Sequence, residues 1–418
     1  MFERPPKESE ILSWGYVLLW SGIIFATVPF VRKAAQYVRE QWGSNTFTYG
    51  VTAVVVLVSI AALAQLLKQH RMLIGSYAWL LGLAGLVVYL TFEFKTPVEA
   101  VHFVQYGLLS LLLYRAFSHR VRDYSIYVAA TIAGTLVGMI DETVQWLTPD
   151  RIFQLKDIWL DLTGVALVQL VLAASIRPRI ISGWPDGTSL RRLCRLGALS
   201  VAYLGLCHLN TPDRITWYTA HVPLLDFIDE NRSVMVEYGY MHSVAANARF
   251  RSRLTAEELR RSARDRAEEG ARILNRYRDR EQYLDFLNIY TPVTDPFLHE
   301  ARVHLFRRDV HLERTKVVEG NDERIWQFTV AFWENRILED YFGDLLHASS
   351  YSLPAGLEES IRQNVPLERN YVSWASHHLI TDYSRQQLFW FFLGTVVGLL
   401  LLGGYFGKRA RGQVQAGA

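Results

Sequence analysis

Eight apolar stretches constrain the fold of this chain more than any other feature. They cover residues 14–31, 48–67, 76–92, 99–117, 124–146, 157–176, 194–209 and 388–406. Each is close to the length of helix that crosses a hydrocarbon core, about 20 residues. Half of the 418 residues are apolar, and the charged ones collect in short connectors and between residues 210 and 387. This pattern predicts an all-α fold, a polytopic transmembrane helix bundle of about eight spans with a helical domain inserted before the last span.

Lysine and arginine in the short connectors predict the orientation of the spans. They concentrate in loops 68–75, 118–123 and 177–193 and in the tail 407–418, which share one side of an eight-span bundle. Cytoplasmic loops are enriched in these residues. We therefore expect both termini in the cytoplasm and residues 210–387 to be extracytoplasmic. The opening segment MFERPPKESE lacks the positive charge of a signal peptide, which predicts an uncleaved anchor.

The positions of the cysteines and the net charge bear on disulfide bonds and on nucleic-acid binding. Cys194 and Cys207 lie on one predicted helix, roughly 20 Å apart, which is too far for a disulfide bond. Residues 210–387 contain no cysteine, so we expect this domain to fold without disulfides. A net charge of only +3 gives no indication of nucleic-acid binding.

Polar residues begin the fourth stretch, at TPVEAVHFVQYG. Thr96, Pro97 and Glu99 fit a capping box at a helix N-terminus. His102 and Tyr106 follow on the same helix face as Glu99. Capping accounts for Glu99, whereas His102 is either a satisfied structural residue or part of a site.

The fifth stretch carries Gly134, Gly138, Asp141 and Gln145 on one face, with Glu142 about a quarter turn away. Two glycines at this spacing let a neighbouring helix approach closely. The same face becomes polar at the end of the stretch, and we expect it to look onto the neighbouring span.

The sixth stretch places Asp157 and Asp161 on one helix face. Asp157 fits a helix cap, but Asp161 lies a full turn deeper and has no such role. In the connector before it, Pro149 and Asp150 predict a turn, and Arg151 stands beside the carboxylates. Arg151 either pairs with one of them or presents its guanidinium to an anionic group such as a phosphate.

Several ionisable residues within neighbouring spans predict a polar pocket, because each one exposed to lipid costs on the order of a few kcal/mol. We expect the pocket at the extracytoplasmic ends of the fourth, fifth and sixth spans. Its candidate residues for head-group binding or acid–base chemistry are His102, Tyr106, Asp141, Glu142, Gln145, Arg151, Asp157 and Asp161. The alternative is an interhelical hydrogen-bond network that only stabilises the bundle.

In this order these residues resemble the VanZ-like family of bacterial membrane proteins. The family has His and Tyr on one helix, then an acidic pair followed by Gln, then Pro, a small residue and Arg, and then Asp, Asn and Gly. The matching residues here are His102, Tyr106, Asp141, Glu142, Gln145, Pro149, Arg151, Asp157 and Gly164. Asp150 stands where Gly is usual, and Asp161 stands where Asn is usual, which adds a negative charge.

The resemblance covers about residues 76–176. The family is named for a protein associated with teicoplanin resistance, which implies work at the cell envelope, in the bacterial cytoplasmic (inner) membrane. The domains we expect are a transmembrane hairpin at 1–75, the VanZ-like domain at 76–176, a basic loop and seventh span at 177–209, the inserted domain at 210–387, and a last span with its tail at 388–418.

The inserted domain is expected to be mainly helical. Residues 254–287 have apolar residues at helical spacing and begin with a capping box, Thr255 to Glu258. Arginines and acids alternate along this segment, which is typical of a solvated, salt-bridged helix. The alternative is a face that binds anionic lipid or a glycan polymer.

A second helix of this domain is expected to begin at Asp295 as its N-cap. Glu300, His304 and His311 share one of its faces, but HEARVH lacks the spacing of a zinc-protease motif. We therefore expect neither a metal nor a cofactor.

Four functions stay open from the sequence. The first is binding or shielding of a polar head group from a membrane lipid, a lipid-linked envelope precursor or a glycopeptide-related molecule. In this hypothesis 210–387 covers the pocket and is also a surface for an envelope protein partner. The second is a membrane-embedded enzyme in which Asp141 or Glu142 acts as base and His102 as acid or base. The third is a proton-coupled transporter, which is disfavoured because the sequence shows no inverted repeat and no polar stripe that reaches the cytoplasmic half of the spans. The fourth is a structural scaffold of an envelope complex.

Overall fold

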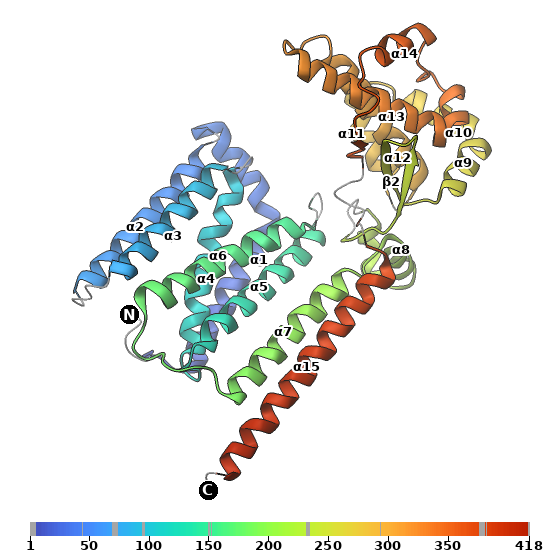
Figure 1. The fold of residues 1–418 in the computed structure, drawn as a ribbon. Coiled ribbons are helices and arrows are strands. Elements are labelled where there is room, and N and C mark those ends of the chain that lie inside the picture. Colours follow the sequence, from blue (N-terminus) through green and yellow to red (C-terminus); the bar gives the residue numbers. More distant parts are fainter. Residues whose placement is uncertain are drawn as a thin grey trace. The chain divides into compact units, whose positions relative to one another are not determined.

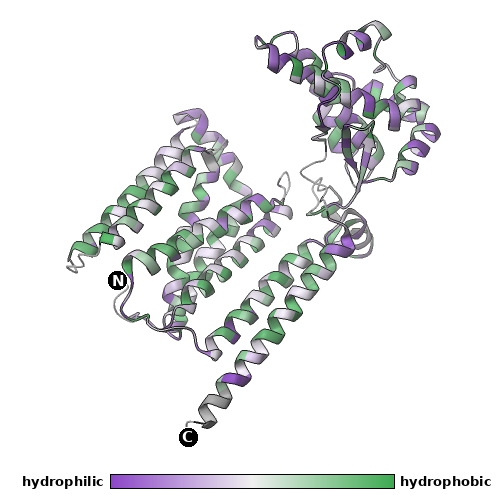
Figure 2. Ribbon diagram, viewed as in Figure 1, coloured by the Kyte–Doolittle hydropathy of each residue, from purple (hydrophilic) through white to green (hydrophobic). Residues whose placement is uncertain are grey.

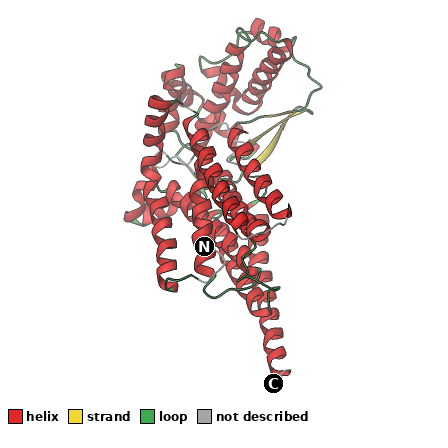
Figure 3. Ribbon diagram, turned by 90° about the vertical axis from the view of Figure 1, so that its left-hand side faces the viewer, coloured by secondary structure: helices red, strands yellow, loops and turns green. Residues whose placement is uncertain are grey.

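The computed structural model describes residues 6–43, 45–68, 74–93, 97–148, 151, 153–230, 235–292, 294–375, 381 and 383–416. The chain divides into two compact units (Figure 1). The transmembrane unit comprises Met1–Cys207 and Phe389–Ala418, and the inserted unit comprises His208–Leu388. Both units are mostly helical (Figure 3).

The transmembrane unit consists of helices with short connections. They are α1 (Glu10–Trp42), α2 (Thr46–Lys68), α3 (Ile74–Glu93), the 3₁₀ turn η1 (Pro97–Ala100), α4 (Val101–Phe117), α5 (Ser125–Trp146), α6 (Leu155–Leu170), the π-helical turn η2 (Val171–Ile176), α7 (Gly187–Cys207) and α15 (Arg385–Ala416). Each of the eight predicted stretches falls largely on one of these helices, and α1 continues well past its predicted span.

Six helices in the described part of the chain are long and apolar enough to cross a membrane. They are Glu10–Val31, Thr46–Leu67, Ile74–Glu93, Ser125–Trp146, Leu155–Ile176 and Arg385–Ala410. Figure 2 shows apolar residues along α2 and α3, and polar residues throughout the inserted unit. The predicted fourth and seventh spans are not among the six, since α4 has 17 residues and α7 begins with a basic segment, GTSLRRLCR.

Helices α4, α5 and α6 pack against one another in the transmembrane unit. Two glycines of α5 make the contact with α6 close. A Cβ at Gly134 would lie 2.7 Å from Val165 Cγ2, and one at Gly138 would lie 2.6 Å from Asp161 Oδ2. The predicted close approach of a neighbouring helix to this face of α5 is therefore confirmed.

Helices α7 and α15 lie side by side and run in opposite directions. A Cβ at Gly187 would lie 2.6 Å from the Phe406 carbonyl oxygen, and one at Gly205 would lie 3.2 Å from Phe392. The start of α7 thus meets the end of α15, and the end of α7 meets the start of α15. The Tyr203 hydroxyl of α7 donates to Thr143 Oγ1 of α5 at 2.8 Å.

The inserted unit combines helices with a small sheet. Its elements are α8 (Pro212–His221), η3 (Pro223–Glu230), β1 (Tyr240–Val244), β2 (Ala248–Ser252), α9 (Ala256–Asp265), α10 (Ala267–Arg276), η4 (Arg280–Gln282), α11 (Tyr283–Ile289), α12 (Pro296–Arg314), α13 (Asn321–Ala348), α14 (Ala355–Arg362) and β3 (Tyr371–Val372). β1 and β2 form an antiparallel hairpin, drawn in yellow in Figure 3. The two-residue strand β3 pairs with β2 in parallel.

The sheet corrects the all-α prediction. Alternate residues of β2 are buried, but the strand is only five residues long. Period-2 burial over so short a stretch gives a weak strand signal. The inserted unit is therefore mostly helical rather than purely helical.

The predicted single helix at 254–287 is also wrong, although its capping box is present. The Thr255 side chain accepts from the Glu258 backbone N–H, and the Glu258 side chain accepts from Thr255. The chain then leaves helical geometry at Arg266, which separates α9 from α10. There the Arg266 guanidinium donates hydrogen bonds to both carboxylate oxygens of Asp295, at 3.0 and 2.6 Å.

Asp295 also starts α12, as predicted. Its side chain accepts from the Leu298 N–H at 3.0 Å, and Pro296 follows at the first helical position. The predicted N-cap is confirmed.

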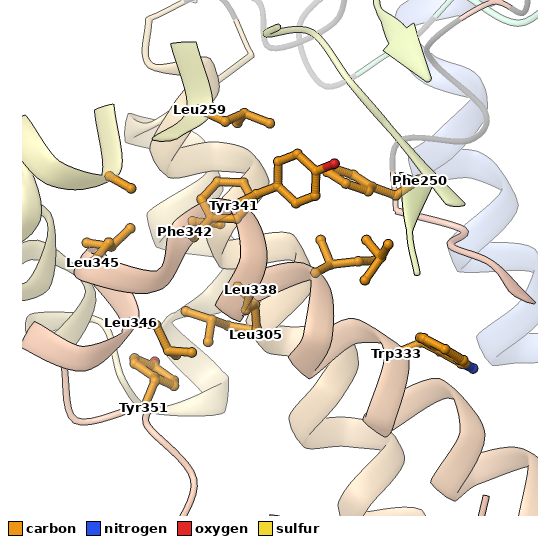
Figure 4. Packing of buried hydrophobic residues seen from close by; sticks show 14 of the residues in the cluster. Phe250, Leu259, Leu305, Trp333, Leu338, Tyr341, Phe342, Leu345, Leu346 and Tyr351 are labelled. Carbon is orange, nitrogen blue, oxygen red and sulfur yellow. The ribbon is translucent and has the colours of Figure 1, made fainter. Parts of the chain in front are cut away.

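The core of the inserted unit lies between α9, α10, α12, α13 and the hairpin. Figure 4 shows its buried residues, among them Phe250, Leu259, Leu305, Leu338, Tyr341 and Phe342. Gly270 lets α10 approach this core, because a Cβ there would lie 2.6 Å from Leu345 Cδ1. Burial of aromatic and aliphatic side chains stabilises the unit, and both cysteines of the chain lie outside it.

Candidate functional site

The described candidate residues lie on α4, α5, α6 and the connector between α5 and α6. His102 and Tyr106 belong to α4, and their rings are nearly parallel with centroids 6.1 Å apart. Asp141, Glu142 and Gln145 belong to the last two turns of α5. Arg151 lies in the connector, and Asp157 and Asp161 lie on the first two turns of α6. Pro149 and Asp150, where we predicted a turn, lie outside the described residues.

His102 and Asp161 make a direct link between α4 and α6. His102 Nδ1 lies 2.7 Å from Asp161 Oδ1. Asp161 is fully buried, and its second oxygen, Oδ2, packs against Gly138 of α5. A carboxylate in this position orients the imidazole ring and accepts a hydrogen bond from Nδ1 when that nitrogen carries the proton.

Gln145 connects the acidic pair of α5 to Arg151. Its amide nitrogen donates to Asp141 Oδ2 at 3.3 Å and to Glu142 Oε1. Its amide oxygen accepts from Arg151 Nη2. Gln145 therefore bridges the Arg151 guanidinium and the two carboxylates. The sequence interpretation expected Arg151 to pair with a carboxylate or to bind an anionic group, and it did not predict this contact with Gln145.

Glu142 holds the connector in place. Its Oε2 accepts from the backbone N–H of Gln154 at 2.8 Å, and Gln154 is the N-cap residue of α6. Both oxygens of this fully buried carboxylate thus have donors within the protein. This arrangement favours a positioning role for Glu142, which shapes the end of α5 and the start of α6.

Of the two residues predicted as helix caps, Asp157 has another role, and the capping box of Glu99 stays a prediction. Gln154 is the N-cap of α6, so the cap role for Asp157 is wrong, and Asp157 lies in the first turn, where an anion complements the helix dipole. Glu99 lies in η1 and pairs with Lys156 at 2.6 Å across to α6. Thr96, the other half of the predicted capping box, lies outside the described residues.

Three buried oxygens at the centre of this cluster lack a hydrogen bond to any described residue. They are Tyr106 Oη, Asp141 Oδ1 and Asp161 Oδ2. The Tyr106 hydroxyl faces both carboxylates without making a well-directed bond to either. Buried polar groups nearly always have a partner. Because a hydroxyl donates one proton, Tyr106 can satisfy only one of the two ionised carboxylate oxygens.

The sequence interpretation missed a second buried polar contact between α4 and α6. Gln169 Nε2 donates to Ser110 Oγ at 2.8 Å and to the Ser110 carbonyl oxygen at 3.0 Å. Ser110 follows His102 and Tyr106 at intervals of four along α4. That spacing on one helix face was the available signal, and it extends the polar stripe deeper into the bundle.

Glu300, His304 and His311 of α12 each contact different side chains in the inserted unit. Glu300 accepts from Ser252 and Arg253, His304 contacts Glu334 at 2.5 Å, and His311 contacts Gln327 at 2.5 Å. In the described residues, no group of three or more His, Cys, Asp or Glu side chains has the arrangement of a metal site.

Several helices of membrane-spanning length around a buried polar cluster define a multi-pass membrane protein. Residues 13–176 match the model of the VanZ/LLP1 family, so this part of the chain is a VanZ-like domain. The match begins well before residue 76 and takes in the helices from α1 to α3 as well as the candidate site. No curated protein and no solved structure shows a significant match to the chain.

Proposed function

We propose that this protein acts at the cell envelope by binding a polar head group between α4, α5 and α6. The head group belongs to a membrane lipid or to a lipid-linked or glycopeptide-related envelope precursor. In this proposal the chain has about eight spans in the inner membrane, with both termini in the cytoplasm. The site then opens to the outer leaflet, and residues 210–387 lie on the same side, where an envelope protein is a further partner.

The observation that supports this proposal is a set of three buried oxygens, Asp141 Oδ1 and Asp161 Oδ2 beside Tyr106 Oη, whose single proton can serve only one of the two carboxylates. Leaving such groups unpaired costs about 1–3 kcal/mol each. Two carboxylate oxygens and a hydroxyl make a site that is rich in acceptors. It therefore suits a head group that offers hydrogen-bond donors, such as sugar hydroxyls, amides or an ammonium group, better than a bare phosphate.

The test is native mass spectrometry of the full-length protein, with Tyr106→Phe as the decisive variant. If a head group is bound, wild-type protein carries a lipid or lipid-linked sugar, and Tyr106→Phe loses it while keeping its melting temperature. If the cluster only holds the helices together, wild-type protein is bare and Tyr106→Phe melts earlier. Tyr89→Phe is the matched control, because this tyrosine of α3 is exposed on the surface of the transmembrane unit.

A second candidate function, acid–base catalysis on the same head group, is favoured by the contact between His102 and Asp161. A carboxylate that orients an imidazole is a common arrangement for a general acid or base. Here Asp161 takes the orienting role and His102 would move the proton, whereas Glu142 has its oxygens occupied. His102→Gln separates the two functions, because a binding protein would retain lipid in this variant and an enzyme would accumulate unconverted substrate.

A further inference from the structure

The inserted unit contains a cavity that belongs to none of the sites described above. It has a volume of about 330 Å³, within the range of small-molecule sites. Its lining residues are Thr211, Asp213, Thr216, Glu237, Tyr238, Arg253, Leu254, Pro292, Pro296 and Arg385. All of them belong to the inserted unit, and they come from α8, from the segments around β1 and β2, from the start of α12 and from the first residue of α15.

The buried side chains behind this cavity include more negative than positive charges. Arg253 forms ion pairs with both Glu237 and Glu300, and these two carboxylates are each 1% exposed. Arg253 is the one cationic side chain within ion-pair distance of either carboxylate in the described part of the chain. Two buried anions therefore share one cation, an arrangement that is costly at low dielectric unless a further positive charge or a proton is present.

The two carboxylates differ in how well they are satisfied. Glu300 accepts from Ser252 Oγ, from the Arg253 backbone N–H and from Arg253 Nη1. Neither oxygen of Glu237 accepts a well-directed hydrogen bond from a described residue, although one of them lies close to Arg253 Nε. Burial, opposed by Arg253, raises the pKa of Glu237. Because Arg253 pairs with both carboxylates, the excess negative charge is shared between Glu237 and Glu300, and Glu237 is the one of the two that lines the cavity.

The rest of the lining suits an organic cation. Tyr238, Leu254, Pro292 and Pro296 provide apolar and aromatic surface for methylene groups next to a positive charge. At the rim, Arg385 already pairs with Asp213 at 3.2 Å and with Thr211 Oγ1 at 3.1 Å, so these two charges compensate each other. The net demand of the site is for one cationic group with hydrogen-bond donors.

We propose that this cavity binds a small organic ammonium group, and that Glu237 is its counter-ion. A primary ammonium offers three donors and supplies the charge that Glu237 and Glu300 lack. The group comes either from a soluble amine or from the ethanolamine of a phospholipid. This inference does not depend on the proposed site between α4, α5 and α6.

Thermal unfolding of the full-length protein in detergent tests the proposal, with ethanolamine hydrochloride as the probe and sodium chloride at equal ionic strength as the reference. We expect ethanolamine to raise the melting temperature by several degrees, and ethylene glycol to leave it unchanged. Glu237→Gln should abolish the shift. This variant is expected to fold because glutamine keeps the size of the side chain and removes the excess charge. Glu257→Gln, at an exposed position of α9, should keep the full shift.

A second variant protects the test against misfolding of the first. Thr216→Trp keeps every charge but fills the cavity from the exposed side of α8, and it should also abolish the shift. The proposal is overturned if wild-type protein shows no shift with ethanolamine, or if both variants shift as wild type does.

Nanodiscs separate the two sources of the ammonium group. If phosphatidylethanolamine nanodiscs stabilise wild-type protein over Glu237→Gln and phosphatidylglycerol nanodiscs do not, the ligand is the lipid head group. If free ethanolamine stabilises the protein equally in both kinds of nanodisc, the ligand is a soluble amine.

Discussion

Asp141 and Asp161 carry the same group on facing helices, but their surroundings predict different outcomes for the same substitution. Asp161 uses one oxygen for His102 Nδ1, and asparagine retains an acceptor for that contact. Asp161→Asn also removes one negative charge from a crowded cluster, and asparagine is usual at this position of the family that the sequence resembles. We expect its melting temperature to be unchanged or slightly higher, and the protein to be at least partly active.

Asp141→Asn is expected to fold and reach the membrane but to lose function. Gln145 donates to Oδ2, so asparagine still has one oxygen for this bond, whereas the oxygen without a donor loses its charge. The paired measurement is the melting temperature in detergent and glycopeptide sensitivity of a deletion strain that carries each variant. Early melting and degradation of Asp141→Asn alone would identify this residue as a structural strut, and the head-group proposal would then be wrong.

Glu334 in the inserted unit makes a pH-dependent contribution to stability. Burial alone would raise its pKa, but His304 and Arg307 and the Tyr371 hydroxyl, which donates at 2.7 Å, outweigh burial and lower it to about 2. A carboxyl group with a lowered pKa in the folded state stabilises the protein above its unfolded value of 4.5. This stabilisation is lost as the pH falls from about 4.5 towards about 2.

Glu334→Gln should therefore destabilise α12 and α13 at neutral pH by about 3–5 kcal/mol, because it breaks a buried charged network. Hydrogen exchange measured by mass spectrometry on the full chain gives the opening free energy of these two helices. The difference from wild type should shrink below pH 4.5. A difference that stays constant with pH would mean that the charge of Glu334 is not what stabilises this region.

The sequence predicted which helix faces the candidate residues share better than it predicted their contacts. Spacing at 3.6 residues per turn located His102, Asp141 and Asp161 on inward faces, because helix geometry alone determines which side chains share a face. It does not determine which atoms meet across helices. The contacts of Gln145 with Arg151 and of Glu142 with the Gln154 N–H depend on the path of the connector, which is not encoded in any periodicity.

At the scale of elements, glycines of α5 set the distance to α6. Gly138→Ala places a methyl group within 2.6 Å of Asp161 Oδ2, and Gly134→Ala places one within 2.7 Å of Val165 Cγ2. Overpacking of this kind typically costs about 1–3 kcal/mol. Both variants should lower the melting temperature of the purified protein, and Gly138→Ala should in addition lose bound head group because it displaces Asp161.

Gly82→Ala is the control for these two variants, because nothing lies within 4 Å of a Cβ at that position of α3. Its melting temperature should equal that of wild type or rise slightly, since alanine favours helix over glycine. If Gly134→Ala and Gly138→Ala also melt as wild type does, α5 and α6 are not packed as closely as described.

Local sequence patterns predicted some element boundaries of the inserted unit but not those that depend on long-range contacts. The capping box at Thr255 and the N-cap at Asp295 were predictable, because both are local hydrogen bonds encoded within four residues. The break at Arg266 was not, because it depends on the long-range pair with Asp295 and on the packing of Gly270 against Leu345. The pairing of β3 with β2 joins residues far apart in the chain and has no local signature.

At the scale of the whole molecule, the orientation in the membrane is the prediction on which the outer-leaflet proposal depends. It is tested by labelling single cysteines in a variant in which Cys194 and Cys207, both buried, are replaced by serine. Glu257→Cys reports on the inserted unit, and Trp184→Cys reports on the loop 177–193, where Trp184 is 87% exposed. Asp150→Cys reports on the connector beside the candidate site.

We expect a membrane-impermeant thiol reagent to label Glu257→Cys and Asp150→Cys in intact spheroplasts, and to label Trp184→Cys only after lysis. The physical reason is the excess of Lys and Arg in loops 118–123 and 177–193, which keeps these loops on the cytoplasmic side during insertion. The opposite result would be labelling of Trp184→Cys in intact spheroplasts, with Glu257→Cys and Asp150→Cys labelled only after lysis. It would place the cluster of His102, Asp141 and Asp161 at the inner leaflet. An outer-leaflet head group could not then reach it, while the ammonium site at Glu237 would remain testable with soluble amines.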